Sequence, residues 1–182
     1  MTRLWLVRHA RPLVAPGLCY GALDVPVDAM ATQLAARRLA AALPPGAQVA
    51  HSTLQRCEQL AQALQALQPD LALNADARLR EMDFGTWEGQ PWHAIGQDAV
   101  DAWTADFATH APGGGESLGA MLERVAQALR DVPAATDVVW ITHAGVARCV
   151  AWLQTQGDAP PRADAWPLAA PGYGEWEVRR LG

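Results

Sequence analysis

Short apolar runs without polar alternation mark the segments of this chain that we expect to form buried strands. The two clearest runs are Leu4 to Val7 and Asp137 to Thr142, and both contain aromatic and β-branched residues. Such continuous runs are typical of strands that are covered on both faces, as in a parallel sheet. A shorter run at Val49 to His51 indicates a third strand, and Gly174 to Val178 indicates an edge strand.

Segments with helical periodicity lie between and after these strands. Apolar residues recur at intervals of three and four over residues 118–132 and again over 146–153, which predicts two amphipathic helices. Residues 52–55 read Ser-Thr-Leu-Gln, a capping box that is expected to begin a helix reaching Leu67. A fourth helix is expected over about 29–43. Two prolines follow directly and would end it there.

The order of these elements predicts an α/β fold with three layers, α/β/α, around a mainly parallel central sheet. With 182 residues, 51% of them apolar, the chain fits one domain over residues 1–182. Residues 82–115 are rich in Trp, Gly and polar residues and interrupt the alternation of elements. We interpret them as an insertion that covers the carboxyl edge of the sheet.

The charged residues exclude several classes of chemistry. All 14 basic residues are arginine, so no lysine is present for a Schiff base or a Walker-type phosphate loop. The net charge of −5 and the absence of basic runs argue against a nucleic-acid partner. The apolar run near the N-terminus is too short for a signal peptide or a membrane span, which predicts a cytoplasmic protein without membrane contact. Cys19, Cys57 and Cys149 lack C-x-x-C spacing and are expected to be reduced thiols.

Two histidines follow directly after the two clearest predicted strands. They are His9, preceded by Arg8, and His143. In an open parallel sheet both would lie at the carboxyl edge, where ligands bind. Arg56 is expected in the first turn of the helix that follows the capping box. Because guanidinium groups and helix N-termini bind oxyanions, the sequence predicts a site for a small phosphorylated substrate.

Phosphoryl transfer requires a nucleophile, neutralisation of the phosphate oxygens and a proton donor for the leaving oxygen. A neutral imidazole that binds a backbone carbonyl through one nitrogen can attack through the other, and His9 is the candidate. The candidate proton donor is Glu81, with Glu88 and Glu116 as nearby alternatives.

Five segments, in this order along the chain, resemble the motifs of the histidine phosphatase (phosphoglycerate mutase-like) superfamily. They are Leu6-Val-Arg-His-Ala10, Ser52-Thr-Leu-Gln-Arg56, Leu79-Arg-Glu-Met-Asp-Phe-Gly-Thr-Trp-Glu-Gly89, Gly115-Glu-Ser117 and Thr142-His-Ala-Gly145. The resemblance implies that His9 accepts the phosphoryl group and that Glu81 is the general acid and base. It implies a phosphate clamp of Arg8, Arg56 and His143, and neither a metal nor an organic cofactor.

Within the superfamily, the short chain and residues Gly17 to Pro26 are most similar to the alpha-ribazole phosphatase branch. This similarity implies hydrolysis of alpha-ribazole 5'-phosphate during assembly of the cobalamin nucleotide loop. The alternatives are a broad-specificity phosphatase of small sugar or nucleotide phosphates, a phosphoglycerate mutase, and a catalytically silent phosphate-binding module. The sequence also leaves open whether the protein forms a homodimer.

Additional substrate contacts are expected around the clamp. Ala144 follows His143, and Arg11 and Tyr20 lie in the loop after His9. Arg11 would add positive charge for the substrate or would be solvated. Many family members carry an asparagine in this loop that helps hold the phosphate, and this chain has none.

The insertion contains several tryptophans. Trp87, Trp92 and Trp103 are expected to pack the insertion, and the alternative is that they stack on a bound benzimidazole.

Overall fold

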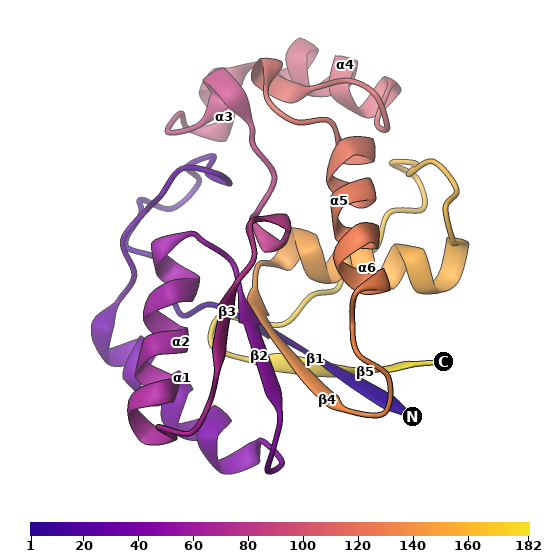
Figure 1. Ribbon diagram of the computed structural model, residues 1–182. Coiled ribbons are helices and arrows are strands. Elements are labelled where there is room, and N and C mark those ends of the chain that lie inside the picture. Colours follow the sequence, from indigo (N-terminus) through magenta and orange to yellow (C-terminus); the bar gives the residue numbers. More distant parts are fainter.

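A five-stranded sheet forms the centre of the computed structural model, which describes residues 1–182 (Figure 1). The strands are β1 (Thr2–Arg8), β2 (Gln48–His51), β3 (Leu73–Ala75), β4 (Asp137–Thr142) and β5 (Trp176–Leu181). They lie in the order β3-β2-β4-β1-β5. The first four strands are parallel, and β5 pairs antiparallel with β1 at one edge. The predicted mainly parallel sheet is therefore confirmed.

Two details of the strands differ from the prediction. The edge strand β5 begins at Trp176, because Gly174 has a φ of +69° and lies in the preceding turn. The strand β3 was not expected, since its three residues include no β-branched side chain. It forms because Leu73 pairs with Val49 of β2, a tertiary contact that local sequence does not encode.

Helices cover both faces of the sheet, which confirms the three-layer architecture (Figure 1). One face carries α1 (Ala29–Ala42) and α2 (Gln55–Leu67), and the other carries α5 (Leu118–Arg130) and α6 (Ala144–Gln156). All four helices were expected from the sequence, although α6 begins earlier and ends later than its apolar pattern. None of the helices in the structure is both long and apolar enough to cross a membrane.

Burial on both faces explains the continuous apolar run of β1. Leu4 and Leu6 belong to the core between the sheet and the α5–α6 layer. Trp5 and Val7 point the other way and belong to the core beneath α1 and α2. Because successive side chains of a strand point to opposite faces, a strand in the middle layer must be apolar at every position.

The predicted capping box at residues 52–55 is wrong. The helix α2 begins at Gln55, and its N-cap residue Leu54 makes no side-chain hydrogen bond. Ser52 lies before the helix and is fully buried, where its Oγ is 2.9 Å from Nε2 of His143. The sequence pattern was misleading because a distant histidine, rather than the first turn of the helix, contacts this hydroxyl.

Residues 82–115 contain only short helices. These are η2 (Gly85–Trp87), α3 (Trp92–Ile95), α4 (Gln97–Ala105) and η3 (Pro112–Gly114). Figure 1 shows α3 and α4 at the top of the molecule, away from the two chain termini. Aromatic rings pack this segment together: Trp103 lies 5.8 Å from Phe84 and 6.0 Å from Trp87 between ring centroids. As expected from the sequence, these tryptophans pack against other aromatic rings of the same segment.

Close backbone contact between η2 and η3 joins the two ends of this segment, and it predicts a specific stability effect. Gly85 has a φ of +54°, and a Cβ there would overlap the Gly113 carbonyl and lie 2.6 Å from the Gly115 nitrogen. We expect Gly85→Ala to lower the free energy of unfolding by about 2–4 kcal/mol, since it adds a clash to backbone strain. Urea denaturation measures the change.

Gly89→Ala is the matched control. Gly89 also has a positive φ, +80°, but nothing lies within 4 Å of its Cβ position. The free energy of unfolding of the Gly89→Ala variant should decrease by only about 1 kcal/mol. Equal losses in the two variants would contradict the steric role of Gly85.

Candidate active site

The pairing of β1 with β4 brings the two candidate histidines together. In the parallel register Arg8 lies opposite Thr142, so the next residues, His9 and His143, leave adjacent strand ends side by side. Their ring centroids are 5.2 Å apart, and both side chains are buried. The carboxyl edge of the sheet therefore holds two imidazoles that are more than a hundred residues apart in sequence.

His9 is held as a neutral imidazole with one free nitrogen. Its Nδ1 is 2.7 Å from the Ala10 carbonyl oxygen. A carbonyl can only accept, so Nδ1 donates and Nε2 keeps its lone pair. Burial, and next the positive charge of Arg56, lowers the pKa of His9 from 6.5 to about 3. His9 lines a cavity, so the arrangement can present a nucleophilic nitrogen there at neutral pH.

Arg56 is a fully buried cation without a carboxylate partner. Its Nη1 donates to the Leu23 carbonyl at 2.9 Å and its Nη2 donates to the Gly21 carbonyl at 2.5 Å. Its Nε is buried and has no partner. The net positive charge stays uncompensated within the protein, and an isolated buried charge is unfavourable. An anion in the cavity would supply the missing counter-charge.

Arg8 is a second cation without a carboxylate partner, and its side chain is half-buried. One Nη donates to the Pro171 carbonyl at 3.2 Å, and the guanidinium carbon lies 3.9 Å above the ring of Tyr173. Its Nε is also buried without a partner. The ring holds the guanidinium through a cation–π contact and leaves its donors available to a ligand.

The N-terminus of α6 adds further hydrogen-bond donors. His143 is its N-cap residue, and Nδ1 of this buried ring has no partner in the protein. Burial, and next the charge of Arg56, lowers the pKa of His143 well below its usual value, so the ring is neutral. The Ala144 amide is the first N–H of α6, one of the groups that a helix leaves unpaired and that favour anions.

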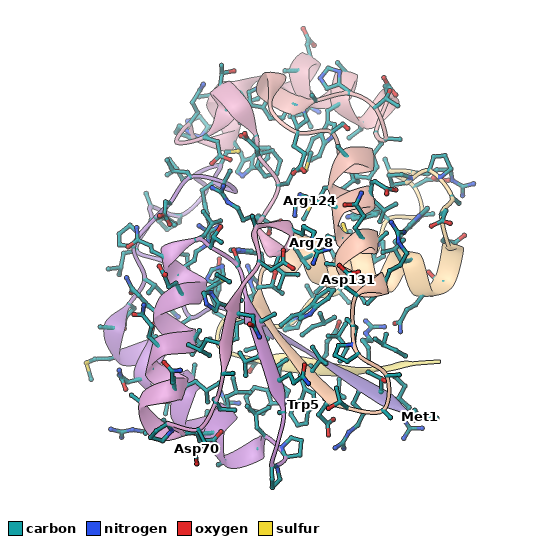
Figure 2. All side chains as sticks on the ribbon, viewed as in Figure 1. Met1, Trp5, Asp70, Arg78, Arg124 and Asp131 are labelled. Carbon is teal, nitrogen blue, oxygen red and sulfur yellow. The ribbon has the colours of Figure 1, made fainter.

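Glu81 is fixed by backbone amides at the edge of the cavity. Its Oε1 accepts from the Met82 N–H and its Oε2 from the Gly145 N–H, each at 3.0 Å. Any side chain at Gly145 would overlap Oε1, so the approach of the carboxylate requires a glycine there. Arg124 of α5 supports the same segment by donating to the carbonyl oxygens of Arg78, at 2.6 Å, and Glu81. Figure 2 shows Arg124 and Arg78 near each other beside α5.

The two alternative carboxylates are engaged elsewhere. Glu116 pairs with Arg124 at 2.6 Å. Glu88 accepts from four backbone N–H groups, those of Gly21, Ala22, Leu23 and Phe84. Neither lines the cavity that contains His9, whereas Glu81 does.

A cavity of about 410 Å³ joins these groups. At one end lie His9, Arg8, Arg56 and Glu81. Tyr20 also lies at this end, since the Arg56 guanidinium carbon is 5.5 Å from the centre of its ring. The other end is walled by aromatic side chains from two separate segments of the chain, namely Phe84, Trp92, Trp103, Phe107 and Trp166. The cavity therefore combines a cationic end, suited to a phosphate, with an aromatic end, suited to a flat apolar group.

The structure brings most of the predicted site residues together. Tyr20 and Ala144 line the cavity with the catalytic candidates, and the ring of His143 lies 5.2 Å from that of His9. Arg11 does not line it: its side chain is exposed and lies in a separate depression beside Arg38. Of the two expectations for Arg11, the solvated side chain is the one that the structure shows.

Three residues of the site were not predicted from the sequence. Tyr173 contacts Arg8, and its hydroxyl is 2.8 Å from that of Tyr20. Trp166 and Arg148 line the aromatic end, and Arg148 donates to the Leu168 carbonyl at 3.1 Å. Trp166 lies in the proline-rich connection after α6 and Tyr173 just beyond it. The only signal there was aromatic residues in an otherwise irregular segment.

Comparisons with known proteins agree with this geometry. The sequence profile of the histidine phosphatase superfamily (branch 1) matches residues 4–170. No protein of curated function matches the chain by sequence. Among solved structures, TTHB049 from Thermus thermophilus is 31% identical, with a TM-score of 0.73, and the match covers 97% of this chain and 92% of that one.

Two further structures share the fold. A mycobacterial glucosyl-3-phosphoglycerate phosphatase is 26% identical with a TM-score of 0.77, over 97% of this chain and 88% of that one. A proposed alpha-ribazole-5'-P phosphatase from Escherichia coli is 24% identical with a TM-score of 0.81, over 97% and 89% of the two chains. The profile match spans all five sequence motifs and the paired histidines, and this chain belongs to the histidine phosphatase superfamily.

Proposed function

We propose that this protein is a metal-independent phosphomonoesterase that acts through a phosphohistidine. The observation that supports the proposal best is the neutral His9, which has a free Nε2 beside two arginines that no carboxylate neutralises. A binding module would need the arginines but neither a nucleophile nor an acid. Here Glu81 also faces the cavity, which favours an enzyme over a silent module.

The phosphate of the substrate binds at the cationic end of the cavity. Arg8 and Arg56 neutralise its oxygens, and the Nδ1 of His143 and the Ala144 N–H donate to them. The ester oxygen points toward Glu81 and the aromatic end. In this orientation the phosphorus lies between the nucleophile and the leaving oxygen, the in-line geometry that phosphoryl transfer requires.

The reaction then proceeds in two displacements. Nε2 of His9 forms a bond to phosphorus as the bond to the ester oxygen breaks, and Glu81, protonated at this stage, donates its proton to that oxygen. After the alcohol leaves, Glu81 takes a proton from a water molecule whose oxygen attacks phosphorus. The P–N bond breaks, inorganic phosphate leaves, and both residues return to their starting states.

Alpha-ribazole 5'-phosphate is the substrate that we propose. Its benzimidazole is a flat apolar group, and the aromatic end of the cavity, with Trp92, Trp103 and Trp166, offers surfaces on which such a ring can stack. The similarity of residues 17–26 to the alpha-ribazole phosphatase branch supports the same choice. In a cell that makes cobalamin, this activity would serve assembly of the nucleotide loop.

A broad phosphatase of sugar phosphates is the second candidate. The relative named as a glucosyl-3-phosphoglycerate phosphatase, at 26% identity, favours it. The two candidates differ in what they require of the aromatic end. A sugar needs hydrogen-bond partners there, whereas a benzimidazole needs stacking surfaces.

The low pKa of His9 predicts a pH dependence of stability. Above pH 6.5 the imidazole is neutral in both the folded and unfolded chains. Below pH 6.5 His9 of the unfolded chain binds a proton, whereas His9 of the folded chain stays neutral until the pH reaches its pKa of about 3. The free energy of unfolding therefore decreases as the pH is lowered from 6.5. The slope approaches about 1.4 kcal/mol per pH unit for each excluded proton. Urea unfolding between about pH 6.5 and pH 5 should show a smaller slope for His9→Gln than for the wild type, and an unchanged slope would contradict the low pKa.

The acid role of Glu81 predicts a dependence on the leaving group. Glu81→Gln should slow alkyl phosphates about 10²–10⁴-fold but slow nitrophenyl phosphate much less, because a nitrophenolate leaves without a proton. Gly145→Ala should show the same selectivity, since the added Cβ displaces Oε1. Gly46→Ala, at an open surface position, is the control for the added methyl group. Steady-state kcat/KM gives the comparison, and equal losses for both esters would remove Glu81 from this role.

The substrate proposal predicts a strong preference among phosphate esters. With chelator present, kcat/KM should be highest for alpha-ribazole 5'-phosphate in a panel that includes 3-phosphoglycerate, sugar phosphates and nitrophenyl phosphate. Trp103→Leu should reduce kcat/KM for the ribazole ester about tenfold or more, by the loss of stacking, and leave a small sugar phosphate nearly unaffected. A flat profile across the panel would favour the broad phosphatase instead.

A further inference from the structure

A buried hydroxyl contacts the second active-site histidine from behind. Ser52 is 0% exposed, and its Oγ lies 2.9 Å from Nε2 of His143. The same Oγ accepts a hydrogen bond from the Leu54 N–H at 3.3 Å. The proposed catalytic steps do not use Ser52, and it does not cap α2, so neither role explains its complete burial.

The direction of the hydrogen bond between Ser52 and His143 follows from counting protons. The Leu54 N–H is a donor, so the Ser52 hydroxyl proton cannot go there. The nitrogen acceptor in contact with Oγ is Nε2 of His143 at 2.9 Å. The Cys57 sulfur also lies within reach of the Ser52 hydroxyl, but a sulfur is a far weaker acceptor than an imidazole nitrogen. Cys57 lies 3.5 Å from the same nitrogen, but its thiol donates to the Thr142 carbonyl at 3.4 Å. Ser52 is therefore the donor and Nε2 the acceptor.

This direction decides which nitrogen of His143 carries a hydrogen. The ring is neutral and has one N–H, and Nε2 accepts, so the hydrogen is on Nδ1. This Nδ1 is buried and has no partner in the protein. A buried donor without a partner is rare in folded proteins, and here it lies beside Arg56 and Arg8, the two unneutralised cations. An oxyanion bound between them would satisfy all three groups.

We propose that Ser52 is a positioning residue that holds His143 in the Nδ1–H tautomer, so that the neutral ring donates a hydrogen bond to the phosphate. The inference rests on the proposed phosphatase function, in which His143 contacts the phosphate. The two histidines then differ through their partners. The Ala10 carbonyl makes His9 present a lone pair, and the Ser52 hydroxyl makes His143 present a hydrogen.

Without Ser52 the tautomer of His143 is no longer fixed. A ring with its hydrogen on Nε2 would direct the Nδ1 lone pair at a phosphate oxygen, and the two would repel. The loss should appear in phosphate binding and turnover while the fold is retained, because the hydroxyl contributes to no helix cap.

The direct test is the tautomer itself, measured by ¹⁵N NMR of histidine-labelled protein. The wild type should show His143 with hydrogen on Nδ1, its signals being identified by their absence in His143→Ala. Ser52→Ala should shift His143 toward a mixture of tautomers and leave His9 unchanged. Hydrogen on Nε2 of His143 in the wild type would overturn the proposal, and this measurement needs no variant of Ser52 that folds.

Kinetics provide the second test. Ser52→Ala should lower kcat/KM for nitrophenyl phosphate about 10²-fold and weaken inhibition by inorganic phosphate, as expected for loss of one oxyanion donor. Added to His143→Ala, it should have little further effect, because Ser52 acts through that ring. Additive losses in the double variant would contradict the proposal.

A matched control removes another buried hydroxyl. Thr32 in α1 is 4% exposed and donates to the Asp28 carbonyl, so its hydroxyl is bonded within its own helix and to neither histidine. Thr32→Val should lower stability but change neither tautomer nor phosphate inhibition. The NMR result does not depend on the natural substrate. Failure of the ribazole proposal would therefore leave this inference intact, and failure of this inference would leave that proposal open.

Discussion

The parallel pairing of β1 with β4 is the constraint on which the site depends. Both strands are buried on both faces, so their apolar side chains fix the register, and a slip of one residue would turn those side chains to the wrong layers. With that register, Arg8 and Thr142 end the strands together, and the residues that follow converge. Packing energy that stabilises the core thus also sets the separation of His9 and His143, without any direct bond between the two rings.

Positive charge is concentrated where the protein supplies no negative charge to balance it. Arg56 and Arg8 are bound by backbone carbonyls and aromatic rings, which orient a guanidinium but leave its charge in place. Burial, and next the charge of Arg56, lowers the pKa of both histidines and keeps them neutral. Folding therefore retains an unfavourable arrangement of like charges, which a bound anion would relieve.

The sequence predicts those features that depend on residues close together along the chain. The strands β1, β2 and β4 were visible as apolar runs, and His9 and His143 could be placed because each follows a strand directly. The sequence did not predict contacts between side chains that are far apart along the chain. Ser52 resembled a helix cap but contacts a histidine that follows β4, and Tyr173 reaches Arg8 from the far end of the chain. Contacts of this kind are set by tertiary packing, which a local window of residues does not contain.

Glu88 links the segment of residues 82–115 to the cationic end of the cavity. Its carboxylate accepts from the amides of residues 21–23, and two carbonyls of that same short loop bind Arg56. The insertion is consequently not a separable module that could be exchanged to change specificity. A grafted replacement that lacks a carboxylate at this point would release the loop and with it the arginine. A change of substrate preference that keeps the arginine in place would therefore replace the aromatic side chains and preserve the Glu88 carboxylate.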